Sequence, residues 1–159
     1  MAVKKKFPAR SAFVACKGSC QKDREVKCQY GCLGCGRCAL VCKLGAVKIG
    51  ELGIAEVDED KCIACGMCVK ECPQKIIHLH ECGNNMIVKC SNHQKGKDAM
   101  EVCPDSCIGC GICEKTCTAG AVKVIDYCAV IDESRCLGCG MCVVKCPRHA
   151  IIDTKGILM

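Results

Sequence analysis

The sequence predicts an α+β fold made of two similar units in tandem, and three observations support this prediction. Four copies of one cysteine pattern, C-x2-C-x2-C-x3-C, are spread along the 159 residues. The residues around them recur at an offset of 74 or 75 positions. Short β-branched segments bounded by turn residues lie between the runs, as expected for small strands.

The internal repeat sets the expected domain boundaries. Its clearest matches are Cys16 with Cys90, Cys28 with Cys103, Cys32 with Cys107, and Cys62 with Cys136. We therefore expect a basic tail over residues 1–12, a first unit over 13–82 and a second over 83–159, with the junction between His80 and Met86. Glu81-Cys82-Gly83-Asn84-Asn85 supplies the turn residues that such a joint needs.

Within each unit, strand-like and helix-like segments alternate. Residues 46–49 and 54–57 are expected to be strands on either side of a turn over 50–53. Strands are also expected over 122–125, 129–131 and 150–152. The stretch from the third to the fourth cysteine of each run, such as Cys38 to Cys42, suits a short helix.

The cysteine spacing is that of bacterial ferredoxins, in which the fourth cysteine of one run ligates the cluster of the partner run. This predicts two 2[4Fe–4S] ferredoxin-like units that hold four clusters. The expected ligand sets are Cys32, Cys35, Cys38 and Cys72; Cys62, Cys65, Cys68 and Cys42; Cys107, Cys110, Cys113 and Cys146; and Cys136, Cys139, Cys142 and Cys117. All sixteen positions are cysteine, so no site is expected to hold a three-iron cluster.

Disulfides and zinc are the competing uses of so many cysteines. Disulfides predominate in secreted proteins, but the basic N-terminus is not followed by the apolar stretch of a signal peptide, and no span suits a membrane helix. We therefore expect a reducing cytoplasm, where thiolates serve as metal ligands. Structural zinc sites draw on separated ligand pairs and often on histidine, which fits these runs less well.

The composition is consistent with clusters that stabilise the interior of the fold. The chain has 23 cysteines but only two Phe, two Tyr and no Trp, so an aromatic-rich core is not available. Small domains of this kind usually need metals or disulfides. The chain without clusters is therefore expected to be largely unfolded.

Seven cysteines lie outside the runs. Cys16, Cys28, Cys90 and Cys103 recur in both units, and four thiolates are what one further cluster needs, so they form a candidate fifth metal site. The alternatives are free buried thiols or a redox-active pair in each unit. Cys20, Cys82 and Cys128 have no repeat partner and are interpreted as incidental thiols.

Charge and motifs limit the classes of function. The formal charge of +6 omits four oxidised cubanes, which with their thiolates would add about −8. Basic residues are not interleaved with aromatics, so no nucleic-acid partner is expected. No nucleophile–base pair or carboxylate dyad stands out, so we expect no catalytic site. The histidines, His78, His80, His93 and His149, are more simply packing or surface residues than ligands.

One enzyme motif overlaps the runs. Cys28-x3-Cys32-x2-Cys35 has the spacing of radical S-adenosylmethionine enzymes, and residues 103–110 repeat it. That interpretation leaves Cys38 and Cys42 unexplained, and it needs a barrel longer than this chain.

Residues 28–38, 57–68, 88–97 and 103–113 resemble the B subunit of Rnf complexes, which are membrane-associated ferredoxin:NAD oxidoreductases. The resemblance implies a polyferredoxin that relays low-potential electrons to or from a partner oxidoreductase. The implied partners are flavoproteins, metal-dependent oxidoreductases or ferredoxin, and peripheral association with a membrane complex.

Two departures from the family keep alternatives open. Members normally begin with a membrane helix and an additional cluster domain, and their first run usually lacks a cysteine at the place of Cys35. The alternatives are a soluble relative serving another reductase, a free ferredoxin shuttle, or a redox sensor that uses the unpaired thiols.

Overall fold

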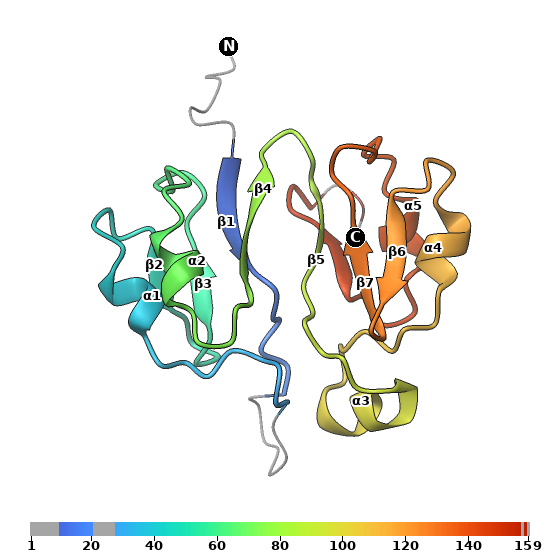
Figure 1. The fold of residues 1–159 in the computed structure, drawn as a ribbon, viewed down its shortest axis with the longest axis horizontal. Helices are drawn as coiled ribbons and strands as arrows, with labels where there is room; N and C mark the ends of the chain where they lie inside the picture. Colours follow the sequence, from blue (N-terminus) through green and yellow to red (C-terminus); the bar gives the residue numbers. More distant parts are fainter. Residues whose placement is uncertain (1–9, 21–27, 157, 159) are drawn as a thin grey trace.

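The computed structural model describes residues 10–20, 28–156 and 158. It consists of two small α+β units that lie side by side, with β4 (Ile77–Glu81) of the first unit and β5 (Met86–Val88) of the second in the middle of the molecule (Figure 1). Each unit contains two separate two-stranded antiparallel sheets and short helices. Residues 1–9 of the expected basic tail fall outside the described residues.

The first unit pairs its first and last strands. Its elements are β1 (Arg10–Val14), α1 (Arg37–Leu40), β2 (Val47–Ile49), β3 (Ala55–Val57), α2 (Met67–Glu71) and β4 (Ile77–Glu81). β1 pairs with β4, placing Ala12 opposite Leu79. β2 pairs with β3, placing Lys48 opposite Glu56.

The second unit repeats this order with one additional helix. Its elements are β5 (Met86–Val88), α3 (Gly96–Val102), α4 (Ile112–Thr116), β6 (Val122–Ile125), β7 (Cys128–Ile131), α5 (Met141–Lys145) and β8 (Ile151–Asp153). β5 pairs with β8 and β6 with β7, both antiparallel. The tandem α+β organisation is therefore confirmed, while the repeat offset of about 75 residues stays a prediction from the sequence.

The helices next to the cysteine runs are too short to be stable by themselves. α1, α2, α4 and α5 have four or five residues each, whereas isolated helices in water need about 12 to 15. Each begins directly after a glycine with φ between 71° and 76°. The left-handed glycine turns the chain out of the cysteine loop and into the helix.

Each unit has its own core, and cysteines belong to both cores. The first packs aliphatic residues such as Val14, Ile54 and Ile77 against Cys38 and Cys68. The second packs residues such as Val122 and Ile151 against Cys107, Cys113 and Cys142. The cysteine loops thus occupy the place that large side chains fill in an ordinary core.

Several elements differ from the sequence expectation. Strands expected over 46–49, 54–57, 122–125, 129–131 and 150–152 are present with ends shifted by at most one residue. β1 begins at Arg10, within the stretch assigned to the tail, because Ser11 and Ala12 are buried against β4. β4, β5 and α3 were not expected, since strands of three to five residues and a seven-residue helix leave no clear periodic pattern.

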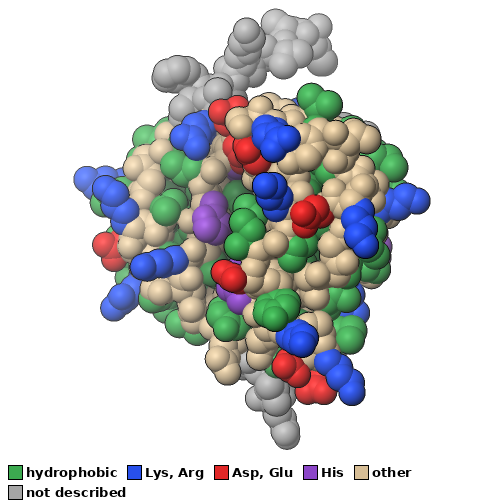
Figure 2. Space-filling view, turned by 45° about the vertical axis from the view of Figure 1, so that its right-hand side comes forward, with side chains coloured by type: hydrophobic (Ala, Val, Ile, Leu, Met, Phe, Trp, Pro, Cys, Tyr) green, Lys and Arg blue, Asp and Glu red, His purple; other side chains and the backbone are tan. Residues whose placement is uncertain are grey.

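The surface is mixed in charge. Lys and Arg side chains are distributed around the face in Figure 2, with acidic and apolar side chains between them. Among the helices of the described residues, none is long and apolar enough to cross a membrane.

Candidate iron–sulfur sites

The four cysteine runs share one pattern of exposure. The second cysteine of each run is exposed, and the third, which lies in the helix that follows, is buried. The exposed set is Cys35, Cys65, Cys110 and Cys139, and the buried set is Cys38, Cys68, Cys113 and Cys142. Each loop therefore presents one thiol to solvent and one to the core.

Three pockets collect three cysteines from one run and the fourth from its partner run. One is lined by Cys32, Cys35, Cys38 and Cys72, together with Pro73 and Ile77. The second is lined by Cys42, Cys62, Cys65 and Cys68, and the third by Cys107, Cys110, Cys113 and Cys146. These are three of the four groups that the sequence predicts.

The fourth predicted group is Cys117, Cys136, Cys139 and Cys142. Burial, together with the nearby Cys136 and Cys139, raises the pKa of Cys142 to about 11. Cys117 and Cys136 pack on the same apolar cluster as Cys142. Backbone N–H groups from residues 119–122, including Ala121, lower the pKa of Cys117 against the effect of its desolvation.

Backbone amides point at several of the cysteine sulfurs. Gly34 N–H donates to Cys32 Sγ at 3.5 Å, and Ala64 N–H donates to Cys62 Sγ at 3.4 Å. A strand amide reaches each of these sulfurs as well, from Ala55 at 3.3 Å and from Ala12 at 3.4 Å. Such donors stabilise thiolate ligands and tune the potential of a cluster.

Burial keeps the third cysteine of each run protonated in the absence of metal. Desolvation raises the pKa of Cys68 and Cys113 to about 11 and also raises that of Cys38. Thiols must lose their protons to ligate metal, so binding releases protons and stabilises the folded arrangement.

The geometry disfavours mononuclear metal sites. Within the described part of the chain, no three Cys, His, Asp or Glu side chains converge closely enough to hold one ion. Four thiolates around a cubane stand farther apart than four ligands of one ion, because the cluster fills the centre. The pockets therefore fit iron–sulfur clusters better than zinc.

Cys128, which the sequence suggested to be incidental, lies between two other cysteines. Its thiol contacts the sulfurs of Cys107 and Cys90 and donates to the Cys90 carbonyl oxygen at 3.3 Å. Hydrogen bonding from Cys128 lowers the pKa of Cys107 to about 6 and that of Cys90 to about 7, while raising its own pKa. Sequence reasoning missed this residue because only the pairing of β6 with β7 brings it to the cluster loop.

The cysteines of the candidate fifth site come together as well, with one addition. Cys16, Cys28, Cys90 and Cys103 line one pocket at the contact of the two units, and buried Cys20 lies among them. Cys20 lacks a counterpart in the second unit, so the repeat could not reveal it. Cys82 lies in the connection between β4 and β5.

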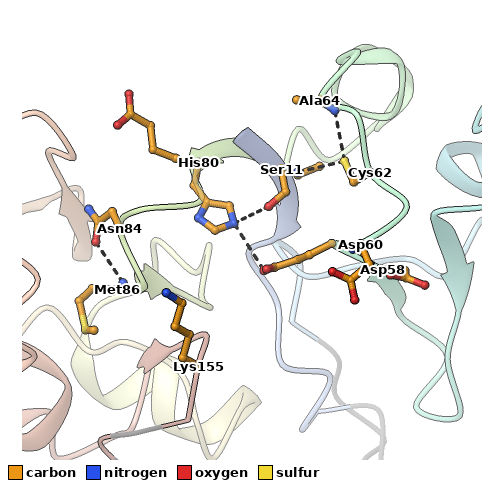
Figure 3. Close-up of polar contacts among 12 residues, drawn as sticks. Ser11, Asp58, Asp60, Cys62, Ala64, His80, Asn84, Met86 and Lys155 are labelled. Carbon is orange, nitrogen blue, oxygen red and sulfur yellow. Dashed lines mark hydrogen bonds and ion pairs between the residues drawn. The ribbon is translucent and has the colours of Figure 1, made fainter. Parts of the chain in front are cut away.

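A buried polar pair lies next to the second pocket. His80 on β4 is 1% exposed, and its Nε2 lies 2.9 Å from Ser11 Oγ on β1 and 3.6 Å from Glu59 Oε1. Figure 3 shows His80 pointing at Ser11, with Cys62 nearby. The pair joins β1 to β4 beside the amide that reaches Cys62.

The other histidines lie at the surface. His78, His93 and His149 are exposed. His93 Nδ1 lies 2.9 Å from the Asp126 carbonyl oxygen. None of these described histidines lines the three cysteine pockets, and neither does His80.

Family models match most of the chain. A model described as a 4Fe–4S dicluster domain matches residues 31–76 and 61–121, and a model described as a 4Fe–4S binding domain matches residues 129–152. The first model matches twice with overlap because the cysteine runs resemble one another.

Curated relatives are subunits of oxidoreductase complexes. The chain is 44% identical over 142 residues to the B subunit of the Na⁺-translocating ferredoxin:NAD⁺ oxidoreductase complex of Acetobacterium woodii, covering 89% of this chain and 41% of the relative. It is 43% identical over 129 residues to the B subunit of the ion-translocating oxidoreductase complex of Methanosarcina acetivorans, covering 81% and 49%. The chain thus spans less than half the length of these relatives.

Among solved structures, a complex of formate dehydrogenase, heterodisulfide reductase and formylmethanofuran dehydrogenase from Methanospirillum hungatei is similar at 22% identity. The match covers 77% of this chain and 51% of that one, with a TM-score of 0.30. This similarity is too weak to inform the arrangement of the units.

Proposed function

The chain belongs to the 4Fe–4S dicluster domain family of iron–sulfur electron-transfer proteins, and from that premise we propose that it relays low-potential electrons for a larger oxidoreductase. The clusters, when bound, supply reversible one-electron transfer. The chain itself holds about four of them, isolates them from one another and presents them to redox partners.

The proposed ligands are the sixteen run cysteines in the crossed sets given above. The observation that carries this assignment is the presence of three pockets in which a fourth cysteine arrives from the partner run. By analogy, Cys117 completes the set of Cys136, Cys139 and Cys142. We further propose that the units expected over residues 13–82 and 83–159 are related by the offset of about 75 residues, with the first unit extended to Arg10 to include all of β1.

The exposed ends of the cysteine loops are the proposed contact points for redox partners. Apolar side chains next to the exposed cysteines are accessible: Leu33 is 60% exposed, Ile63 52% and Leu137 78%. Apolar surface beside a solvent-accessible ligand suits brief docking of another redox protein. The partners would be ferredoxins, flavoproteins or metal-dependent oxidoreductases.

The relatives support a role within a complex. They are named as subunits of ion-translocating ferredoxin:NAD⁺ oxidoreductases. We propose that this chain is likewise an electron-transfer module, without a catalytic site, on the cytoplasmic side of such a complex.

Reversible reduction tests this function. The anaerobically loaded chain is titrated with dithionite and then mixed with an oxidised low-potential ferredoxin, while visible absorbance and electron paramagnetic resonance are recorded. We expect about one electron per cluster to be taken up and then passed on. Loss of clusters on one redox cycle, or a change in thiol reactivity without transfer, would instead favour a sensor.

Purification from the native source separates a subunit from a shuttle. A dedicated subunit co-elutes with a membrane-extracted oxidoreductase, whereas a shuttle elutes as a free chain.

A further inference from the structure

Five cysteines outside the ferredoxin runs meet where the two units touch. Cys16, Cys20 and Cys28 come from the first unit, and Cys90 and Cys103 come from the second, and all line one pocket. In Figure 1 this place is near the foot of the molecule, where the segment after β1 approaches α3. The crossed ligand sets use none of these thiols.

Four of the five sulfurs accept the same backbone hydrogen bond as the run ligands. The donor is the amide two residues later: Gly18 for Cys16, Tyr30 for Cys28, Asn92 for Cys90 and Asp105 for Cys103. Cys32 and Cys62 accept from Gly34 and Ala64 at the same spacing. In this turn, the backbone N–H of the second following residue donates a hydrogen bond to the cysteine sulfur.

Cys16 and Cys90, which the repeat places at equivalent positions in the two units, each accept a second hydrogen bond from a backbone amide. Cys32 N–H donates to Cys16 Sγ, and Cys107 N–H donates to Cys90 Sγ at 3.2 Å. Because Cys32 and Cys107 are proposed cluster ligands, the pocket is linked through one peptide to a cluster loop in each unit.

Polar contacts hold the two sides of the pocket in register. Ser19 Oγ donates to Asp105 Oδ2 at 2.5 Å, next to Cys20 and two residues after Cys103. Ser91 Oγ donates to the Tyr30 carbonyl oxygen at 2.6 Å, next to Cys90 and two residues after Cys28. Each contact crosses between units beside candidate ligands, so the thiols are positioned by both units together.

Size and charge fit a cluster at this place. The space between its lining side chains, counted with the solvent at its mouth, is about 300 Å³; the corresponding values are 340 and 330 Å³ for the first and third ligand sets and 910 Å³ for the second. Lys17 and Lys89 also line it. The Asp105 carboxylate lines it too and accepts from Ser19, so the two ammonium groups leave a net positive charge that would offset part of the roughly −2 charge of an oxidised cubane with its four thiolates.

We propose that the chain holds a fifth [4Fe–4S] cluster between its two units, ligated by Cys28, Cys90, Cys103 and one of the pair Cys16 and Cys20. This inference rests on the proposed function and extends it: the site lies between the cluster loops of Cys32 and Cys107 and connects the two units electronically. It also fastens the units to one another. A structural zinc ion is the competing occupant, but no three of these five described thiols converge on a point that fits one ion.

Metal content tests the proposal directly. Iron and acid-labile sulfide are counted in the anaerobically purified, reconstituted full chain, together with the spin count after complete reduction. We expect about twenty irons per chain, and about sixteen in the Cys28→Ser/Cys103→Ser double variant, with one spin fewer. Cys82→Ser is the matched control and keeps about twenty. A wild-type count of about sixteen irons, whether or not zinc is also bound, or a double variant that loses no iron, would overturn the fifth cluster.

Two further variants choose the fourth ligand and guard against misfolding. Whichever of Cys16 and Cys20 is the fourth ligand, its single substitution by Ser is expected to remove the fifth cluster. The Cys16→Ser/Cys20→Ser double variant is expected to lose the cluster in either case, and retention of about twenty irons in that variant would contradict the proposal. If the Cys28→Ser/Cys103→Ser chain fails to fold, the wild-type iron and spin counts still decide. A wild-type count far below about sixteen would instead contradict the proposed function, so the two failures are distinguishable.

Discussion

The two units hold their cysteine loops in the same way but support them with different hairpins. In the first unit, β2 and β3 are joined through residues 50–54 with Gly53 at φ 71°. In the second, β6 and β7 are joined by the two residues Asp126 and Tyr127, both at positive φ. Each hairpin packs on a glycine of the first loop of its unit: Gly34 meets the Gly53 carbonyl, and Gly109 meets the Tyr127 backbone.

Both units therefore keep the contact between the cysteine loop and the hairpin, while the length of the hairpin connection differs between them. A two-residue turn with positive φ matches the twist of the strands, and the longer turn reaches the same contact with glycine. The tight turn brings Cys128 onto β7, where it touches the Cys107 sulfur. The corresponding part of the first unit carries the buried Ile54.

Removing the clusters should have the largest effect, and it should affect both units. Because the helices next to the cysteine runs have only four or five residues and cysteines line both cores, we expect chelation under reducing conditions to unfold the chain. Far-ultraviolet circular dichroism and a lost thermal transition would report this. A chain that keeps a cooperative transition without iron would show that the aliphatic core is sufficient.

Gly109→Ala tests the contact between loop and hairpin. A Cβ at this position would lie 2.9 Å from Tyr127 Cα, at a φ of +65°. We expect destabilisation of about 1–3 kcal/mol and weaker binding of the cluster in that loop, measured by chemical denaturation and iron content. Gly83→Ala is the control, since φ there is not positive and a Cβ would meet nothing within 4 Å. Equal stability of the two variants would refute the role of the contact.

Ser11→Ala tests a feature of the first unit. Ser11 is fully buried and bonded to His80, so we expect its loss to cost about 1 kcal/mol, with the first unit affected more than the second in hydrogen exchange. Ser134→Ala removes a hydroxyl whose hydrogen bond to Asp132 is exposed to solvent, and it should change stability by less than about 0.5 kcal/mol. Equal protection loss in both units would contradict the local role of the pair.

Cys128→Ala should have the smallest effect and should act on potential rather than on folding. Removing the thiol removes a donor to the Cys107 sulfur, and donors to ligand sulfurs favour the more negative, reduced cluster. We expect a potential lowered by some tens of millivolts, on a scale of about 59 mV per 1.4 kcal/mol for one electron. A potentiometric titration followed by electron paramagnetic resonance measures it, with Cys82→Ala as the control. A raised or unchanged potential would exclude this role.

The local sequence predicted the grouping of the cysteines in their loops, but it did not predict several of the elements that surround these loops. The crossed ligand sets are a prediction from spacing, since the swapped fourth cysteine is typical of such runs, and three of the four predicted groups each line one pocket in the structure. By contrast, β1 and β4 have no hairpin turn to reveal their pairing, since Ala12 and Leu79 are far apart in sequence. The positions of Cys20 and Cys128 depend on tertiary contacts between and within the units, and no repeat signal marks either residue.

Pairs of ligand substitutions test the crossed sets most directly. Cys35→Ala/Cys72→Ala takes two ligands from one proposed cluster, whereas Cys65→Ala/Cys72→Ala takes one ligand from each of two. The number of intact [4Fe–4S] clusters, counted by iron content and reduced-state spin quantitation, should fall by one in the first variant and by two in the second. A loss of two clusters in the first variant and one in the second would show that Cys72 ligates the same cluster as Cys62, Cys65 and Cys68 of its own run, and would contradict the crossed ligand sets.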